Sequence, residues 1–302
     1  MRVTNQIITR NSQARLQSGL QGIDRLREDI SSGIRVRKMS DDPTAAGEVV
    51  RVGSSMRAIA MFRRNIDIGL SRAATEETAL NQLGDGLTRS IELGIAQASG
   101  TSTAQTRLIA KAEVDQLIGF AVGLGNTKFG DDYVFGGTRS TEQPLRVPPN
   151  AAASFSNLML GASAVDPSGA ISLEVGDNKY VTPNHNASDI FINSDALESL
   201  RALSTALGSN DVPGIQAATG RLNAADSVVQ NMLGTQGARI NEMESARTNL
   251  DGLELTLKAF RSDLRDTEVD KAMAELVGKQ TMYQAAMSAT SRILGLSLAN
   301  YL

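Results

Sequence analysis

The sequence of 302 residues contains no cysteine, no tryptophan and only one histidine. Without cysteine the chain has no disulfide framework, no thiolate zinc site and no thiol nucleophile. A histidine-rich metal site or a Ser-His-Asp triad would depend on His185 alone, so neither is expected. Aromatic residues make up 4% of the chain. Such a low share is typical of long helices that pack through aliphatic side chains.

Long apolar runs are also absent. No stretch of the sequence approaches the roughly 20 apolar residues that a transmembrane helix needs, so we expect no membrane insertion. The first residues, Met1 to Gln6, do not form the apolar segment of a secretory signal. We therefore expect a cytosolic protein, or one that is exported without a cleaved signal peptide.

Charge is nearly balanced overall, at −3, but it is unevenly distributed. Residues 1–72 contain thirteen Arg or Lys and seven Asp or Glu, a net charge of +6, so the rest of the chain carries −9. A basic arm is a feature of nucleic-acid-binding proteins, but this one has apolar heptad positions and few aromatic residues that could stack on bases. We expect no nucleic-acid partner. The arm is interpreted as a solvated helix face or, more specifically, as one half of a charge-complementary contact between subunits.

Apolar residues recur at spacings of three and four over long tracts. The first tract runs from Val49 to Ile91. It follows Asp42, whose carboxylate suits a helix N-cap, and Pro43, which suits the first helical turn. The second runs from Ile215 to Leu264. Seams sustained over so many heptads predict long helices that pair with one another, and a shorter tract over residues 110–124 predicts a helix that returns along the first.

Both ends of the chain carry apolar seams of their own. After Asp266-Thr267-Glu268 interrupts the second tract, a new register continues to Leu302, and its apolar face is too large for one helix to bury. We expect this face to be buried in an assembly and only partly covered in a free monomer. The opposite end of the chain is expected to be one of its partners. The predicted subunit-interface residues are Leu16, Leu20, Ile23, Ile30, Leu276, Tyr283, Met287, Leu294, Leu298 and Tyr301.

The pattern changes between Gly136 and Asp195, where five prolines are incompatible with long helices. Alternating apolar residues at 171–175, a Gly-Asp-Asn turn and a β-prone stretch at 179–182 predict a hairpin. The fold class is therefore mainly α, with a long antiparallel helical coiled-coil rod from both termini and a small β-rich inserted domain. We predict three domains: residues 1–40 plus 265–302 (terminal coiled coil), 41–138 plus 196–264 (helical rod) and 139–195 (β-rich insert).

Few residues are candidates for chemistry. His185 lies in a Pro-Asn-His-Asn stretch and is interpreted as a solvated loop histidine, because no second ligand accompanies it. Capping explains Asp41-Asp42 and a turn explains Asp131-Asp132. We therefore expect no catalytic, cofactor-binding or metal-binding residues, and hence no enzyme. An enzyme with its site in the insert stays open as an alternative, and a deep pocket with convergent polar groups there would favour it.

Residues 30–47 read Ile-Ser-Ser-Gly, a basic stretch and then Ser-Asp-Asp-Pro-Thr-Ala-Ala-Gly. This segment closely resembles the N-terminal signature of bacterial flagellins and their relatives. Residues 65–70, 93–101 and 259–268 resemble further blocks of that family, so that the resemblance covers both helical arms. The signature residues in the first segment are Ser32, Gly33, Asp41, Asp42 and Pro43.

A further block separates branches within this family. Residues 126–138 contain Gly-Asp-Asp-Tyr-Val-Phe-Gly-Gly, which resembles the block of the members that join the hook to the filament; its signature residues are Tyr133, Phe135 and Gly137. The resemblance implies a structural adaptor of the flagellum that assembles through its terminal helices. Flagellin, the filament subunit itself, is the alternative.

The resemblance also implies location and partners. Members of the flagellin family are exported unfolded through the flagellar type III channel and reside in the extracellular flagellum. Their paired termini lie in the inner layer of the tube, and the insert faces outward. The implied partners are copies of the chain in a ring or tubular assembly, a neighbouring hook-associated protein, flagellin and an export chaperone. Ile91 replaces the second arginine of the segment by which an innate receptor recognises flagellins, so that property is not carried over. A cytosolic coiled-coil scaffold or a nucleic-acid binder that uses the basic arm stays a further alternative. Nucleic-acid binding that weakens steeply with salt concentration would favour it.

Overall fold

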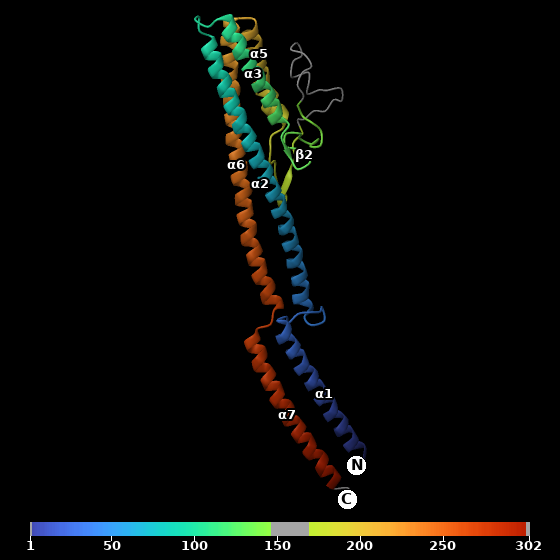
Figure 1. The fold of residues 1–302 in the computed structure, drawn as a ribbon. Coiled ribbons are helices and arrows are strands. Elements are labelled where there is room, and N and C mark those ends of the chain that lie inside the picture. Colours follow the sequence, from blue (N-terminus) through green and yellow to red (C-terminus); the bar gives the residue numbers. More distant parts are fainter. Residues whose placement is uncertain (1, 146–168, 300–302) are drawn as a thin grey trace. The chain divides into compact units, whose positions relative to one another are not determined.

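The protein is described here by a computed structural model that covers residues 2–145 and 169–299. Over these residues the chain is mainly helical, and a long helix lies at each end of the described range (Figure 1). The helices are α1 (Arg2–Ser32), α2 (Pro43–Gln97), α3 (Ala104–Gly125), α5 (Ala196–Gly208), α6 (Val212–Arg265), α7 (Val269–Ala299) and a short π-helix, η1 (Ser188–Asn193). The predicted fold class, mainly α with a small strand-containing insertion, is confirmed.

Strands occur as two small antiparallel hairpins in the described residues. One joins β1 (Lys128–Phe129) to β2 (Asp132–Tyr133). The other joins β3 (Leu173–Gly176) to β4 (Lys179–Val181). In the second hairpin the residue in the turn, Asn178, has a φ of 56°, which asparagine tolerates better than most residues. The hairpin predicted from the alternating residues 171–182 is therefore confirmed.

The chain forms two compact units, each built from segments that are distant in the sequence. We call residues 1–58 with 252–302 the terminal unit, and residues 59–251 the central unit. Both contain parts of the long helices α2 and α6. The three-part domain division drawn from the sequence stays a prediction.

The core of the central unit explains the low aromatic content of the sequence. It joins aliphatic side chains of α2, α3, α5 and α6, including Leu83, Leu87, Val114, Leu200 and Leu222. The fully buried aromatic rings in the described part of this core are Phe135 and Phe191, which meet edge to face with centroids 5.7 Å apart. The hairpin β3–β4 buries Val175 and Val181 against Ile66 of α2 and Met243 of α6 in a second cluster. The inserted region is therefore anchored on both long helices.

One sequence interpretation is wrong. His185 is not a solvated loop histidine, because its side chain is only 12% exposed and its Nδ1 lies 2.7 Å from Oε1 of the fully buried Glu76. The partner lies 109 residues away, so no local pattern pointed to it. Among the described residues, no helix has an apolar run that would reach across a bilayer.

Candidate assembly interface

The end of α1 is shaped by two residues of the predicted family signature. Gly33 has a φ of +69°, a left-handed conformation that glycine adopts without steric cost and that commonly ends helices. The Ser32 hydroxyl donates to the carbonyl of Glu28 (2.7 Å) and accepts from the backbone N–H of Ile34 (3.3 Å). Together they stop the helix and turn the chain.

The segment that follows α1 pairs with the segment between α6 and α7. Ile34 and Asp266 form an isolated antiparallel bridge. The N–H of Arg35 donates to the carbonyl of Arg265 (2.8 Å), and the N–H of Thr267 donates to that of Gly33 (2.9 Å). These backbone contacts join the N-terminal and C-terminal parts of the terminal unit over a sequence separation of more than two hundred residues.

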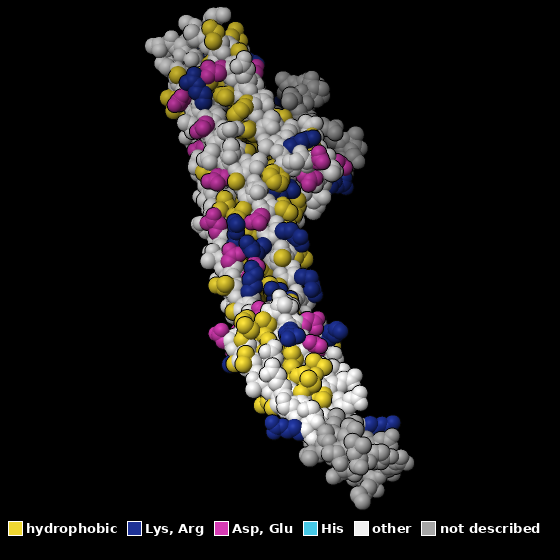
Figure 2. Space-filling view, turned by 60° about the horizontal axis from the view of Figure 1, so that its bottom comes forward, with side chains coloured by type: hydrophobic (Ala, Val, Ile, Leu, Met, Phe, Trp, Pro, Cys, Tyr) yellow, Lys and Arg dark blue, Asp and Glu magenta, His cyan; other side chains and the backbone are white. Residues whose placement is uncertain are grey.

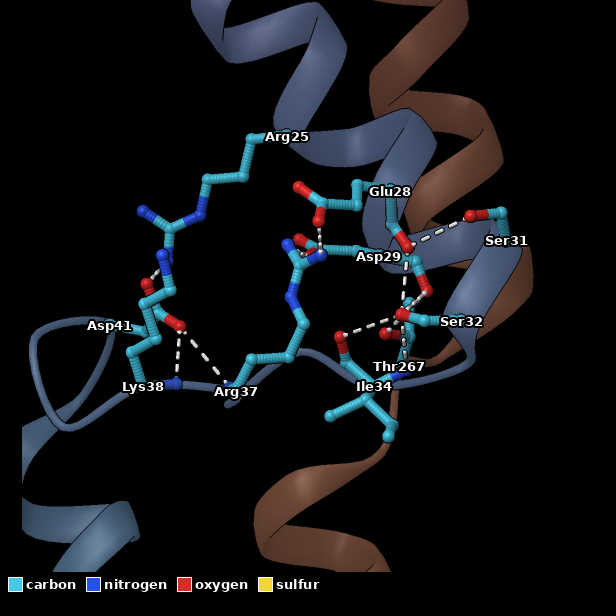
Figure 3. A network of polar contacts seen from close by, with 10 residues as sticks. All are labelled: Arg25, Glu28, Asp29, Ser31, Ser32, Ile34, Arg37, Lys38, Asp41 and Thr267. Carbon is cyan, nitrogen blue, oxygen red and sulfur yellow. Dashed lines mark hydrogen bonds and ion pairs between the residues drawn. The ribbon is translucent and has the colours of Figure 1, made fainter.

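Charged side chains close the turn that leads into α2, as Figure 3 shows. The Arg37 guanidinium reaches back to Asp29 (2.7 Å) and Glu28 (2.6 Å) on α1. The Asp41 carboxylate accepts from the N–H groups of Lys38 (2.9 Å) and Arg37 (3.2 Å). The Lys38 N–H, followed by that of Arg37 and the Arg25 and Arg37 charges, lowers the pKa of Asp41 below its usual value despite its partial desolvation. The carboxylate therefore stays ionised and holds the turn.

The start of α2 follows the predicted capping arrangement. Oδ1 of Asp42 accepts from the N–H groups of Thr44 (3.1 Å) and Ala45 (3.0 Å), and Pro43 is the first residue of the helix. A capping carboxylate of this kind is worth about 1 kcal/mol. The signature residues Ser32, Gly33, Asp41, Asp42 and Pro43 thus act together: they end one helix, turn the chain and begin the next.

The terminal helices α1 and α7 pack side by side and antiparallel, as predicted (Figure 1). Near one end Thr267 donates to the carbonyl of Asp29, and farther along the ring of Tyr283 lies against Gly19. Ile23 and Leu26 of α1 and Ala272 of α7 are buried in this contact.

The pairing leaves much of the apolar surface uncovered. A groove of about 460 Å³ remains open between α1 and α7, lined by Leu16, Gly19, Met282 and Tyr283 among others. Figure 2 shows hydrophobic side chains gathered over this unit, in the lower half of the view. Exposed large apolar residues in the terminal unit are Ile7, Leu20, Met39, Val50, Leu253, Leu255, Phe260, Val269, Met273, Val277, Met282 and Met287. Contiguous exposed apolar surface of this kind marks an interaction site.

The predicted interface residues fall into four groups. Ile23 is buried between the helices, and Leu16, Ile30, Leu276 and Tyr283 are half-buried. Leu20 and Met287 are exposed, at 43% and 51%. The side chains of Leu294 and Leu298, and all of Tyr301, lie outside the described residues. Their role in subunit contacts stays a prediction.

The block at residues 126–138 forms the hairpin β1–β2 and the turn behind it, within the central unit. Val134 and Phe135 are fully buried. The Phe135 carbonyl accepts from the N–H of Ala187 (3.0 Å), and its ring meets Phe191 of η1. Tyr133 is half-buried under the Lys128 ammonium, which lies 4.7 Å from the ring centroid.

The two glycines of this block have structural reasons of their own. A Cβ on Gly136 would lie 2.9 Å from the Arg139 carbonyl oxygen and 3.0 Å from Cα of Ser140, so only glycine fits. Gly137 has a φ of 58°. The signature residues Tyr133, Phe135 and Gly137 thus belong to a tight turn whose apolar side chains pack into the core of the central unit.

Sequence reasoning missed two buried polar groups. Arg107 is 4% exposed and donates to the carbonyls of Gln97 (3.0 Å) and Ser99 (3.1 Å) and to the Asn210 side chain. The other is the Glu76–His185 pair described above. The sequence offered one signal for these groups, namely a charged residue within an apolar helical tract. That signal does not show which groups Arg107 or Glu76 would contact. Within the described ranges, no group of three or more acidic or histidine side chains is placed to hold a metal ion.

Comparisons with known proteins agree with these observations. The family model described as the bacterial flagellin N-terminal helical region matches residues 3–140, and that of the bacterial flagellin C-terminal helical region matches residues 213–302. The chain is 24% identical to a flagellin of Bacillus subtilis strain 168, with 95% of this chain and 94% of the relative covered. It is also 24% identical to flagellar hook-associated protein 3 of Escherichia coli K12, with 90% of each covered.

Solved structures share the fold at low sequence identity. The flagellar hook-associated protein-3 of Legionella pneumophila superimposes with a TM-score of 0.62 at 13% identity, covering 72% of this chain and 98% of that one. FlgL of Xanthomonas campestris superimposes with a TM-score of 0.60 at 16% identity, covering 70% and 99%. Nearly the whole of each of these structures is therefore matched within this chain.

Proposed function

Because this chain belongs to the bacterial flagellin family, we propose that it is the adaptor that joins the flagellar hook to the filament. As a member of this family it is a structural component of the flagellum and not an enzyme. The observation that carries the finer assignment is the turn at residues 130–137. It is built around Tyr133 and Phe135 in the pattern of the junction branch, and it lies in a fold shared with solved junction proteins over nearly their whole length.

Assembly proceeds through the terminal unit. The exposed apolar side chains on α7, among them Val269, Met273 and Val277, are about half covered already, so each gains roughly 1 kcal/mol when an assembled neighbour covers the rest. The partners are copies of this chain in a ring or tubular assembly, a hook-associated protein on one side and flagellin on the other. Before assembly, an export chaperone covers the terminal faces, and the chain leaves through the type III channel.

An adaptor and a filament subunit differ in where they are found. Immunogold labelling of isolated flagella should place this protein in a single narrow band at the hook end. Labelling along the filament would instead support flagellin. That alternative is kept because a Bacillus subtilis flagellin is as similar in sequence as the Escherichia coli hook-associated protein.

A further inference from the structure

A group of polar side chains interrupts the apolar contact between α2 and α6 in the central unit. We call it the polar layer, and it consists of Arg72 and Glu76 of α2 and Gln236 and Arg239 of α6. The side chains of Glu76 and Gln236 are fully buried, and Arg72 is 7% exposed. Buried apolar clusters flank the layer along both helices. The layer is therefore a polar break within a long apolar seam.

The polar layer holds the segment that follows the β3–β4 hairpin. The backbone N–H of His185 donates to both carboxylate oxygens of Glu76, at 3.1 Å each. The side-chain amide of Gln236 donates to the carbonyl of Pro183 (2.7 Å). Because one contact comes from α2 and the other from α6, this segment is fastened to both long helices.

Arg72 extends the layer to the turn at residues 130–137. Its guanidinium lies 3.5 Å from the carbonyl oxygen of Tyr133 and 3.7 Å from the carboxylate of Asp132. The turn that carries the proposed adaptor assignment is therefore also fastened to the polar layer.

The layer stabilises the helix pair less than well-packed apolar side chains would. Burial raises the pKa of Glu76, while His185 and then Arg239 lower it, so the site is a costly place for a carboxylate. Four buried polar atoms in and beside the layer have no hydrogen-bond partner among the described residues: Arg72 Nε, Gln236 Oε1, Arg239 Nη1 and Asn184 Oδ1. Incompletely paired polar groups cost free energy when buried. Stability alone therefore does not explain why the layer is polar.

Two close approaches define how α2 and α6 are aligned in this unit. A Cβ on Gly69 would lie 2.8 Å from Sδ of Met243, and a Cβ on Gly94 would lie 3.4 Å from Cβ of Thr219. Between these contacts α2 advances by 25 residues (69 to 94) while α6 returns by 24 (243 to 219), as expected of a regular antiparallel pair. This alignment brings the α2 half of the polar layer opposite its α6 half.

A slip of one heptad would leave apolar residues opposite apolar residues, so the apolar seam alone does not prevent it. The polar layer does. A slip in one direction places Glu76 opposite Val229 and Met232. A slip in the other direction places it opposite Met243 and Ala246. All four are buried or half-buried apolar side chains, which supply no hydrogen bond to a buried polar group.

We propose that the polar layer is a register lock, which allows α2 and α6 to pair in one alignment and thereby fixes where the turn at 130–137 is held on the helices. The apolar heptads drive the pairing, and the layer selects the alignment, since every slipped pairing buries Glu76 and Gln236 away from their polar partners. The lock does not depend on the adaptor assignment, because a filament subunit with these residues would need the same alignment.

The absence of cysteine from the sequence allows the alignment to be read by disulfide trapping in the full chain. Gly94→Cys with Thr219→Cys reports the native alignment, because the two Cβ atoms would lie 3.4 Å apart, close to the roughly 3.5–4.5 Å found in disulfides. Gly94→Cys with either Val212→Cys or Asp226→Cys reports a slip of one heptad in one direction or the other. These two chains also carry Thr219→Ala, which removes the hydroxyl that would crowd residue 94. Each chain is unfolded in urea and refolded in a glutathione buffer, and the disulfides of the monomer are mapped by mass spectrometry.

With the polar layer intact, the native pair should close in nearly all molecules and the slipped pairs in fewer than about 1 in 100, because slipping strands a buried charge. With Glu76→Leu and Gln236→Leu together, the slipped products should rise at least about tenfold. The control is Glu77→Leu with Asn241→Leu, the same kind of change at exposed positions of the same helices, and it should keep the native alignment. Glu76→Gln should also keep it, since the amide oxygen still accepts from the His185 N–H.

The helical circular dichroism signal and the urea transition show whether each variant refolds. A Glu76→Leu, Gln236→Leu chain that refolds and still closes only the native pair would overturn the proposal. Failure of that chain to refold would also overturn it, because the layer would then be needed for folding itself and not for the choice of alignment. Slipped products in the exposed control or in Glu76→Gln, at the level of the double-leucine chain, would contradict it as well.

Discussion

Single residues of the signature segment each satisfy a backbone group that would otherwise lack a partner. Helix ends and turns leave N–H or carbonyl groups free, and here Ser32 at the end of α1, Asp41 in the turn and Asp42 at the start of α2 supply short polar side chains at those places. Arg37 then balances the buried carboxylate of Asp29. Some of the positive charge of this segment therefore pairs with carboxylates inside the terminal unit, which explains in part why the N-terminal arm is basic.

Gly136 should not tolerate even a methyl group. Gly136→Ala places Cβ against the backbone of Arg139 and Ser140, and this overpacking should destabilise the central unit by about 1–3 kcal/mol in urea unfolding. The control is Gly86→Ala on α2, where a Cβ meets no atom within 4 Å. That change should be neutral or should stabilise the unit by roughly 0.5–1 kcal/mol. Equal effects of the two substitutions would show that the turn can shift to make room.

Arg107 should matter far more than an exposed arginine of the same unit. Arg107→Met removes the donor to the carbonyl of Gln97 and one of two donors to that of Ser99, and it should cost about 2–4 kcal/mol because hydrogen bonds from a buried charged group are lost. Arg89 is half-exposed and pairs with Glu113 at the surface, so Arg89→Met should leave the urea midpoint almost unchanged. Similar midpoints for the two variants would contradict this structural role.

At the scale of the helices, the exposed face of α7 should serve assembly and not the fold of the monomer. Val277 is 63% exposed, so Val277→Asp should change the thermal stability of the isolated protein by no more than about 0.5 kcal/mol. It should nevertheless block assembly, because an assembled neighbour would have to desolvate the new carboxylate. Motility of a complemented deletion strain is the readout.

The matched control lies on the same helix. Lys271 is 78% exposed and forms only a surface pair with Glu268, so Lys271→Asp should leave motility intact. If Val277→Asp also restored motility fully, the face of α7 would not be the contact surface.

Helix boundaries could be read from the sequence because their signals are local. Asp42-Pro43 announced the start of α2, and the break at Asp266 to Glu268 falls between α6 and α7. The pairing of Glu76 with His185 could not be read, because those residues meet only after the hairpin folds back onto α2. The separate helix α5 was also not distinguished from the long tract that follows it. The turn between the two helices, at Asn210 (φ 58°), is in fact flanked by Gly208 and Pro213, which are local signals of a helix end and of a helix start.

At the scale of the whole molecule, the proposed function requires unlike neighbours. A filament subunit accepts copies of itself above and below without limit, since head-to-tail contacts that do not close generate filaments. An adaptor has to stop after a defined assembly, because one side must bind a hook-associated protein and the other flagellin. The purified chain should therefore not polymerise into long filaments by itself. Electron microscopy of concentrated protein would show this.

Deleting the gene separates the two functions most directly. Without the adaptor, hooks should remain on the cells, no filament should be attached to them, and flagellin should accumulate in the medium, because export continues while the docking surface for the first filament subunits is missing. Without one of several flagellins, the hooks should instead carry filaments of normal base and reduced length built from the remaining subunit. Electron microscopy of the cells and immunoblots of the medium distinguish these outcomes. Reintroducing the Lys271→Asp chain should restore filaments and the Val277→Asp chain should not, which ties the phenotype to the exposed face of α7 and not to loss of the protein.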